Sequence, residues 1–331
     1  MAGSEGTTSA RHVVFLLHDG CELIDFAGPA AVFGAVRTRR GRPAYRITVA
    51  SRATPGVRLT TAGAGGVVVA VDAAPRCLAD ELDTLVVPGG ARVADAARDT
   101  ALLGDVRSLG RQARRVVSVS SGAILLAAAG LLHGRRATSH WTAVDRLRRD
   151  YPSVDVAADV LWVRDGDVYT SAGATTGIDL ALALVEDDHG LAVAHELARR
   201  LVVFARRPAG QPQRSVRMSL PPPATPSLRQ ALDLAVLDPG ADLSVGALAR
   251  RAAMSPRHFS RRFQAELGTT PARYVESVRV EAARQLLEQS GDTLEVVAKS
   301  AGFRSAETMR RAFLRTLGVP PGAVRRSVPC P

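Results

Sequence analysis

A serine hydroxyl at the junction of an expected strand and an expected helix is the first group in this chain that could do chemistry. The buried run Arg115–Val119 leads directly into Ser120, Ser121 and Gly122, after which small residues continue as a helix. A side chain at such a strand-to-helix elbow is exposed above the sheet, close to the amide groups that open the helix. The position is therefore a candidate nucleophile or ligand contact.

Three other segments could complete a pocket around this serine. Gly89 and Gly90 end a second strand with backbone N–H groups free to bind an anion, and Asp25 follows the first strand. Asp25 could equally cap the helix that follows it. A serine needs an adjacent base, and the candidate is His140, 20 residues after Ser120. The residues are compatible with a vestigial packing turn, a small-molecule pocket or a hydrolytic site, and we favour the packing turn.

The remaining reactive side chains predict no metal or redox centre. The three cysteines, Cys21, Cys77 and Cys330, have neither metal-ligand spacing nor the pattern of a disulfide framework. The acidic run Glu186–Gly190 ends an expected helix with its side chains facing several directions. We interpret that run as solvated charge, and we predict no metal, no cofactor and no catalytic residue.

Arginine-rich helix faces recur near the C-terminus at a fixed offset. Six residues reappear 50 positions later: Ser255, Arg261, Phe263, Leu267, Gly268 and Pro271 as Ser305, Arg311, Phe313, Leu317, Gly318 and Pro321. Each unit is predicted to be a helix, a tight turn and a second helix, with Ser244 and Ser255 as caps in one and Thr293 and Ser305 in the other. A helical bundle whose arginines are merely solvated is the alternative, but two matching faces favour two helix-turn-helix units that bind DNA.

One long helix is expected to join the two units. The segment 271–289 would be about 28 Å long at 1.5 Å per residue. Successive major-groove faces on one side of DNA lie about 34 Å apart. The spacing therefore allows the two units to occupy adjacent turns of the groove.

The elements that must position these groups divide into two classes. Short β-branched runs alternate with helical patterns in the first part: the strands are expected at 11–17, 45–51, 84–87 and 115–119, with helices at 24–36 and 122–131. This alternation predicts an α/β domain, a parallel sheet flanked by helices. After Ser227 only helices are expected. Six prolines between Arg206 and Ser227 predict a linker at 206–226, between domains at 11–205 and 227–328.

Charge and hydropathy limit the function classes further. The 331 residues carry a formal net charge of +11, and the smaller C-terminal part holds more than half of it. An excess of this sign indicates an acidic partner such as nucleic acid. The longest apolar stretch is interrupted by serines and is shorter than the 20 or so residues that a membrane helix needs. No signal peptide is evident, and we expect a cytoplasmic protein, nucleoid-associated when bound to DNA.

The C-terminal motifs also resemble a known family. The segments SPRHFSRRFQAELGTTPARYV and VVAKSAGFRSAETMRRAFLRTLGVPPGAVR are similar to the AraC/XylS type of DNA-binding domain. The resemblance implies base-reading side chains on the second helix of each unit: Arg257, Ser260 and Arg261, then Ala306, Glu307, Arg310 and Arg311. We assign Arg262 and Arg315 to phosphates, which position a protein on DNA without specifying sequence.

The N-terminal part resembles the ThiJ/PfpI, or class I glutamine amidotransferase-like, superfamily. The segments that carry the resemblance are ELIDFAGPAAVF, LVVPGG, SVSSGAILLAAAGLLHGRRATSHW and TSAGATTGIDLALALVEDDHG. Enzymatic relatives carry a nucleophilic cysteine at the elbow, and Ser120 stands in its place here. The resemblance therefore implies a vestigial pocket around Asp25, Gly89, Gly90, Ser120 and His140, and no enzyme.

Together the two resemblances indicate a regulator of the AdpA-like subgroup. We predict a sequence-specific, dimeric transcription regulator that binds double-stranded operator or promoter DNA with two helices per chain. A small-molecule effector and RNA polymerase are further candidate partners, and no membrane partner is expected. The alternatives are an amidase-like or glyoxalase-like enzyme with a DNA-binding appendage, and a non-specific DNA-coating protein whose affinity is mostly counterion release.

Overall fold

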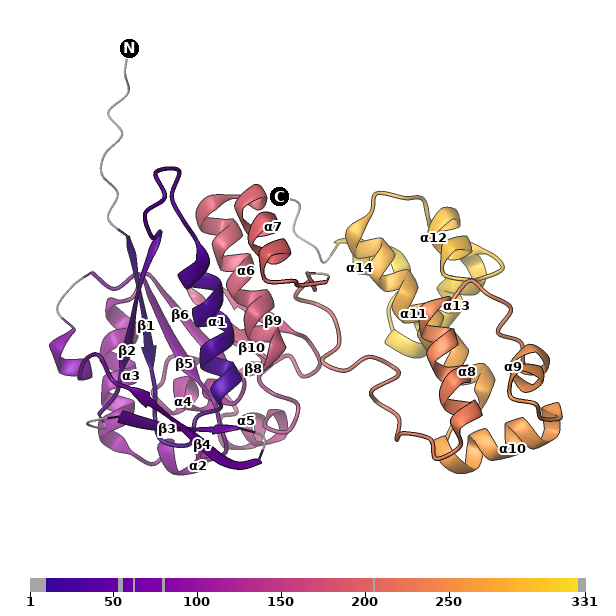
Figure 1. Cartoon of the computed structure of the whole chain (residues 1–331), viewed down its shortest axis with the longest axis horizontal. Coiled ribbons are helices and arrows are strands. Elements are labelled where there is room, and N and C mark those ends of the chain that lie inside the picture. The colour runs from indigo at the N-terminus through magenta and orange to yellow at the C-terminus, as the bar shows by residue number, and fades with distance from the viewer. Residues whose placement is uncertain (1–9, 53–55, 62, 79–80, 205, 327–331) are drawn as a thin grey trace, which may run out of the picture. The chain divides into compact units, whose positions relative to one another are not determined.

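The computed structural model describes residues 10–52, 56–61, 63–78, 81–204 and 206–326. The chain forms two compact units, and the boundary between them falls after Gln213. Figure 1 shows the first unit as a sheet with helices on both faces and the second as helices alone. The predicted fold class, an α/β unit followed by an all-α unit, is confirmed. No helix in the described ranges combines the length and apolarity needed to cross a bilayer.

The first unit is built on a central sheet in which neighbouring strands are parallel except at one edge. Its strand order is β2-β1-β5-β6-β10-β9, and only β9 runs antiparallel to its neighbour β10. The strands of the unit are β1 (Arg11–Leu16), β2 (Tyr45–Ala50), β3 (Gly56–Thr61), β4 (Gly63–Ala70), β5 (Thr84–Pro88), β6 (Arg115–Val119), β7 (Arg136–Ala137), β8 (Asp155–Val156), β9 (Trp162–Asp165) and β10 (Val168–Ser171).

Helices cover both faces of this sheet, because successive side chains of each buried strand point to opposite sides. Val13 and Phe15 of β1 join the core under α1, α6 and α7, whereas Val14 and Leu16 join the core under α3, α4 and α5. The helices are α1 (Leu23–Ala35), α2 (Val93–Ala96), α3 (Thr100–Gln112), α4 (Gly122–Ala128), α5 (Val144–Asp150), α6 (Thr175–His189) and α7 (Leu191–Arg200), with a 3₁₀ turn at Pro75–Cys77.

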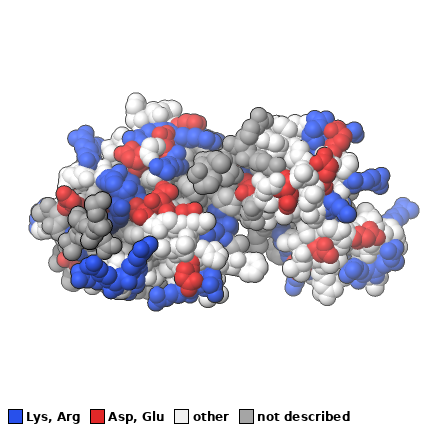
Figure 2. Space-filling view, turned by 90° about the horizontal axis from the view of Figure 1, so that it is seen from above, with Lys and Arg blue, Asp and Glu red and all other residues white. Residues whose placement is uncertain are grey.

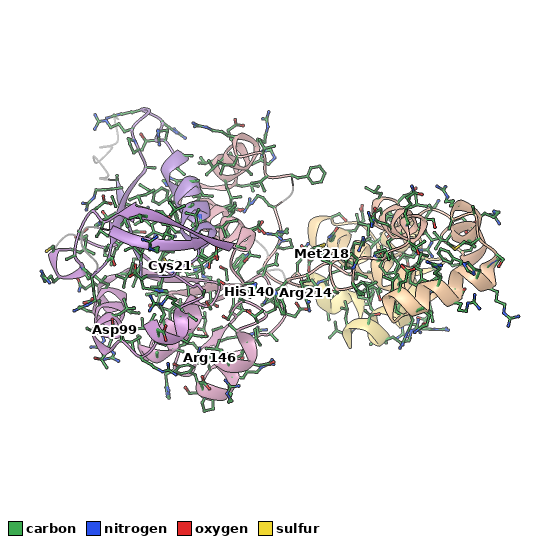
Figure 3. The ribbon with its side chains drawn as sticks, turned by 60° about the horizontal axis from the view of Figure 1, so that its bottom comes forward. Cys21, Asp99, His140, Arg146, Arg214 and Met218 are labelled. Atoms are coloured by element: carbon green, nitrogen blue, oxygen red, sulfur yellow. The ribbon has the colours of Figure 1, made fainter. Side chains whose placement is uncertain are left out.

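The four strands predicted from β-branched runs are β1, β2, β5 and β6, and the two predicted helices are α1 and α4. All six are confirmed to within a few residues at their ends. Strands β9 and β10, and the hairpin β3–β4 that pairs outside the main sheet, were not predicted from the sequence. Asp99 caps α3 by accepting hydrogen bonds from the N–H groups of Ala101 and Leu102 (Figure 3).

The second unit contains two helix-turn-helix repeats joined by one long helix. Its helices are α8 (Pro226–Leu237), α9 (Val245–Arg251), α10 (Pro256–Leu267), α11 (Pro271–Gln289), α12 (Leu294–Ser300), α13 (Ala306–Leu317) and α14 (Pro321–Arg326). The expected long helix and all four expected caps are confirmed. Ser244, Ser255, Thr293 and Ser305 each accept a hydrogen bond from a backbone N–H in the first turn of the following helix.

Each repeat has its own core. Phe259 and Phe263 are buried against the first repeat, with Tyr274 of α11 beside them, and Met309 and Phe313 occupy the equivalent places in the second. Because residues four apart share one helix face, α10 and α13 each bury one apolar stripe and leave the opposite face in solvent. The exposed stripes carry the arginines.

The turns of the two repeats differ in length. The first helices, α9 and α12, are 49 residues apart, whereas the second helices, α10 and α13, are 50 apart. The turn of the second repeat therefore contains one additional residue before its cap, Arg304. Both turns begin with a left-handed residue, Ala253 at φ +51° and Gly302 at φ +80°.

Candidate nucleic-acid interface and elbow pocket

Ser120 lies at the predicted elbow between β6 and α4, and its backbone there is strained. Its φ of +60° lies in the left-handed region that non-glycine residues rarely adopt. Two glycines make this turn possible. A Cβ at Gly173 would lie 2.2 Å from the Cβ of Ser120, and one at Gly122 would lie 2.2 Å from the carbonyl oxygen of Val87. The packed loops thus hold the serine in place at the ends of β6 and β10.

The group that faces this elbow from α1 is Asp25. Its side chain is 1% exposed, and Oδ1 accepts a hydrogen bond of 2.7 Å from the N–H of Ala174. Burial raises the pKa of Asp25 to about 6, and the bond from Ala174 and the nearby Ser120 hydroxyl only partly oppose that effect. The alternative interpretation of Asp25 as a helix cap is wrong, because α1 begins after Glu22 without a side-chain cap.

No hydrogen bond joins His140 to Ser120 among the described residues, and the ring is instead bonded within its own loop. Its Nδ1 lies 2.7 Å from the Thr142 hydroxyl, two residues along the same loop. Burial lowers the pKa of His140, so the ring favours its neutral form. The link from this loop to the elbow is structural instead, because the Ser139 hydroxyl donates to the carbonyl oxygen of Ser120 at 3.0 Å.

The glycine turn after β5 is not an open anion site. The N–H of Gly90 donates to the Ser121 hydroxyl at 3.0 Å, so the prediction that this group is free to bind an anion is wrong. Cys21 pairs with Gly90 in an isolated β-bridge and lies inside the unit (Figure 3). Burial raises the pKa of the Cys21 thiol to about 12, which keeps it protonated and unreactive.

Within the acidic run at the end of α6, Asp187 is exposed, but Asp188 is not solvated charge, contrary to the sequence-based interpretation. The Asp188 side chain is 3% exposed and meets the buried guanidinium of Arg115 at 2.6 Å. Tyr45 donates a further hydrogen bond to Asp188 at 2.7 Å. No group of three or more potential metal ligands occurs among the described residues.

The segment that follows α7 is fastened to the loops around the elbow. We call residues 206–213 the strap. The Arg207 guanidinium binds the nearly buried Asp179 carboxylate at 2.6 Å and the Thr175 hydroxyl at 2.8 Å. Both partners lie in the first turns of α6, directly after Ala174, whose N–H binds Asp25. One end of the strap is therefore held one residue away from the Asp25 contact.

The other end of the strap is held by the loop on the opposite side of the elbow. The Gln213 side chain donates to the carbonyl oxygens of Ser139 and Ala158 at 2.9 and 3.1 Å. Between the two ends, the carbonyl oxygen of Ala209 accepts from the N–H of Leu161 at 2.9 Å. These contacts were not predicted from the sequence, because prolines and glycine in this stretch indicate only the absence of a helix.

The exposed face of α10 presents the first set of predicted DNA contacts. Arg257 and Arg261 are exposed, and Ser260 is half-buried beside them. Arg257 forms no side-chain hydrogen bond or ion pair with any described residue. Arg261 contacts only His258, at 3.5 Å. Two guanidinium groups without carboxylate partners thus project from the first turns of this helix.

The corresponding face of α13 is organised differently. Glu307 binds Arg310 at 2.7 Å and Arg311 at 2.9 Å, so one carboxylate holds both arginines. The two arginines lower the pKa of Glu307 to about 2 and keep it ionised. Ala306 offers only a methyl group. The second set of predicted contacts is therefore brought together, but its charges are paired within the helix.

The two arginines predicted to contact phosphates are also paired. Arg262 binds Glu266 at 3.0 Å, and Arg315 binds Glu276 at 2.6 Å. Surface ion pairs of this kind contribute little stability, so a DNA phosphate can replace the carboxylate as the partner of either arginine at a small cost in free energy. Basic and acidic side chains are interspersed over the visible face of both units (Figure 2), so charge alone does not locate the interface.

Comparison with known proteins identifies both units. Residues 11–187, more than half of the sequence, match the DJ-1/PfpI family. The chain belongs to the DJ-1/PfpI family. Residues 248–327 match a helix-turn-helix domain. The predicted combination of a ThiJ/PfpI domain with an AraC-type helix-turn-helix domain is confirmed, whereas the AdpA-like subgroup remains a prediction.

Relatives of this DJ-1/PfpI protein include regulators and an enzyme. It is 35% identical over 260 residues to the HTH-type transcriptional regulator Rv1931c of Mycobacterium tuberculosis, covering 75% of this chain and 96% of that protein. It is 29% identical over 329 residues to the HTH-type transcriptional regulator GlxA of Rhizobium meliloti, covering 98% and 99%. It is also 42% identical over 127 residues to the isonitrile hydratase of Pseudomonas putida, covering 38% and 54%.

Proposed function

We propose that this protein is a dimeric, sequence-specific transcription regulator that reads major-groove bases with α10 and α13. The observation that carries the proposal is the exposed face of α10, where Arg257 and Arg261 project from a capped helix without carboxylate partners. A guanidinium can bind guanine O6 and N7 together, which is worth about 1–3 kcal/mol of discrimination. The relatives that are named as regulators support the same function.

Ser260 and the side chains of α13 complete the proposed reading surface. In the second repeat these are Ala306, Glu307, Arg310 and Arg311, with Arg262 and Arg315 contributing phosphate contacts. Glu307 would have to release its arginines, or accept a hydrogen bond from cytosine while holding them. Each chain would then contact one half-site with two helices, and a dimer would contact two.

In this proposal the residues around the elbow, Asp25 and Ser120, bind a small-molecule effector. Asp25 is a buried carboxylate whose Oδ2 has no hydrogen-bond partner among the described residues. A ligand with a donor group there would satisfy that oxygen. The strap is fastened to both loops around Ser120 and continues directly into the helical unit, so a ligand that displaces either loop would loosen the strap.

The test separates base readers from phosphate contacts in the full-length chain. Arg257→Ala and Arg261→Ala should relax preference at particular base pairs. Arg262→Ala and Arg315→Ala should weaken binding to all sequences alike. Equal behaviour of the two classes on matched and mismatched duplexes would contradict the assignment of α10 as a reading helix.

An amidase-like or glyoxalase-like enzyme is the second candidate, favoured by the strained elbow at Ser120 and by the isonitrile hydratase relative. Serine is a weak nucleophile without a base, and the His140 ring is hydrogen-bonded to Thr142 instead. Turnover of a carboxamide or a 2-oxoaldehyde by the purified chain, abolished in Ser120→Ala, would establish the enzyme. Turnover that persists in that variant would not come from the elbow.

A further inference from the structure

The second helix-turn-helix repeat contains a hollow lined by cationic side chains and no carboxylate. Its volume is about 470 Å³. Arg279 of α11, Lys299 at the end of α12, Arg304 of the turn and Thr308 of α13 line it, together with the loop at Gly240. Lys299 is the single lysine of the chain.

The walls of the hollow are fixed by backbone contacts. A Cβ at Gly302 would lie 2.2 Å from the carbonyl oxygen of Pro239, so only glycine lets the turn close against that loop. Arg279 donates to the carbonyl oxygens of Pro239 at 3.0 Å and Ala241 at 3.1 Å. These bonds hold its guanidinium at the base of the hollow without neutralising its charge.

The charge at the mouth of the hollow is unpaired. Lys299 and Arg304 are exposed, and neither side chain forms a hydrogen bond or ion pair within the described ranges. Their neighbours on α13 differ in this respect, because Arg310 and Arg311 are both bound to Glu307. Asp242 acts electrostatically on Arg279, but an anion at the mouth would meet Lys299 and Arg304, which have no carboxylate partner among the described residues.

The described turn of the first repeat differs from this site in its residues. At the 49-residue offset of the first helices, Arg250 corresponds to Lys299 and Ala253 to Gly302. Nothing corresponds to Arg304, which is the additional residue of the longer turn. Conversely, at the 50-residue offset the first repeat has the unpaired Arg257 where the second has Glu307.

We propose that this hollow binds a phosphate group of the DNA backbone at the edge of the groove that α13 enters. The second repeat then anchors the protein on the backbone, while the first repeat supplies most of the base discrimination. Phosphate is the anion that DNA presents beside either groove, and arginine and lysine are its usual protein partners. This inference rests on the proposed DNA-binding function and assigns unequal tasks to its two helices.

The expected loss of DNA affinity follows from counterion release. Each phosphate contact contributes a slope of about −0.9 to the dependence of log affinity on log salt concentration. Between about 1 M and 0.15 M salt, one phosphate contact therefore strengthens DNA binding about fivefold. Its loss lowers affinity near 0.15 M by about that factor. The loss should be the same for every DNA sequence, because the phosphate carries no sequence information.

The experiment compares Arg304→Gln, Lys299→Gln and the double variant with the full-length wild-type chain. Arg199→Gln is the matched control, since it removes one exposed arginine from the N-terminal unit, where it pairs with Glu196. Affinity is measured by fluorescence anisotropy over a range of NaCl concentrations. The two probes are a labelled duplex with a motif selected by the full-length protein and a labelled duplex of scrambled sequence.

The double variant should reduce the salt slope by about one and lower affinity about fivefold on both duplexes, each single variant should lose a share of that contact, and the control should be unchanged. Wild-type slopes in Arg304→Gln and Lys299→Gln, or losses confined to the motif duplex, would overturn the proposal. So would saturable binding of inorganic phosphate to the DNA-free chain that Arg304→Gln abolishes while the DNA slope stays unchanged. Equal wild-type affinity for both duplexes would instead count against sequence-specific regulation, and the slope comparison would still test the hollow.

Discussion

Replacing Asp25 by asparagine should change how the stability of the N-terminal unit depends on pH. Burial raises the pKa of Asp25 from 3.8 to about 6. At 1.36 kcal/mol for each pH unit, ionising this carboxyl in the folded unit costs about 3 kcal/mol more than in the unfolded chain. The stabilisation from the protonated carboxyl is fully present below about pH 4 and is lost as the pH rises through 6.

As the pH rises from 4 to 8, the free energy of unfolding of Asp25→Asn should therefore increase by up to about 3 kcal/mol relative to that of the wild type. The amide oxygen can still accept from the N–H of Ala174, and the amide nitrogen would replace Oδ2, which has no partner of its own. Any cost of burying that nitrogen is the same at every pH. That cost shifts the difference in unfolding free energy between the two proteins by a constant and does not change how the difference depends on pH.

Urea unfolding followed by tryptophan fluorescence isolates this unit in the full chain, because both tryptophans, Trp141 and Trp162, belong to it. The control is Asp145→Asn, since the Asp145 side chain is 93% exposed. It should follow the wild type at every pH. If the difference in unfolding free energy between Asp25→Asn and the wild type does not vary with pH, the reasoning about the buried carboxyl is refuted.

Three further predictions test the core, the elbow and the strap. Phe263→Ala should destabilise the helical unit by about 3–5 kcal/mol, measured by circular dichroism, because its ring is buried in the core of the first repeat. Gly173→Ala should lower the fluorescence-detected unfolding midpoint, since its φ is +91° and the new Cβ would clash with Ser120. In the matched variant Gly104→Ala, inside α3, the new Cβ has no neighbour within 4 Å, and the N-terminal unit should be stabilised by up to about 1 kcal/mol. Asp179→Asn should increase hydrogen exchange in the strap, and unchanged exchange there would show that its ion pair does not fasten it.

The features that the sequence predicts correctly are those determined by local chemistry. The caps of α10 and α13 follow from Ser255 and Ser305, because each bonds to a backbone N–H three residues later. The buried strands follow from β-branched runs, since both faces of a parallel sheet are covered. The position of the elbow at Ser120 follows from its place between strand and helix. None of these requires knowledge of distant segments.

The features that the sequence did not reveal depend on partners far along the chain. Asp188 looked solvated, but its partner Arg115 lies 73 residues away, and no helical pattern indicates that pair. Spacing from Ser120 made His140 a candidate base, whereas the ring is oriented by its own loop toward Thr142. The strap was missed for the same reason, because its bonds reach residues 20 to 74 positions upstream.

Selection of bound DNA from a random-sequence pool by the full-length protein tests the central claim most directly. Arg257 and Arg261 on α10 should impose strong base preferences in one major-groove segment, with weaker preferences in the adjacent segment, near physiological salt. A dimer should recover that arrangement twice, once in each half-site. Recovery of no motif, with binding that disappears as salt rises, would contradict sequence-specific regulation and leave an electrostatic DNA binder.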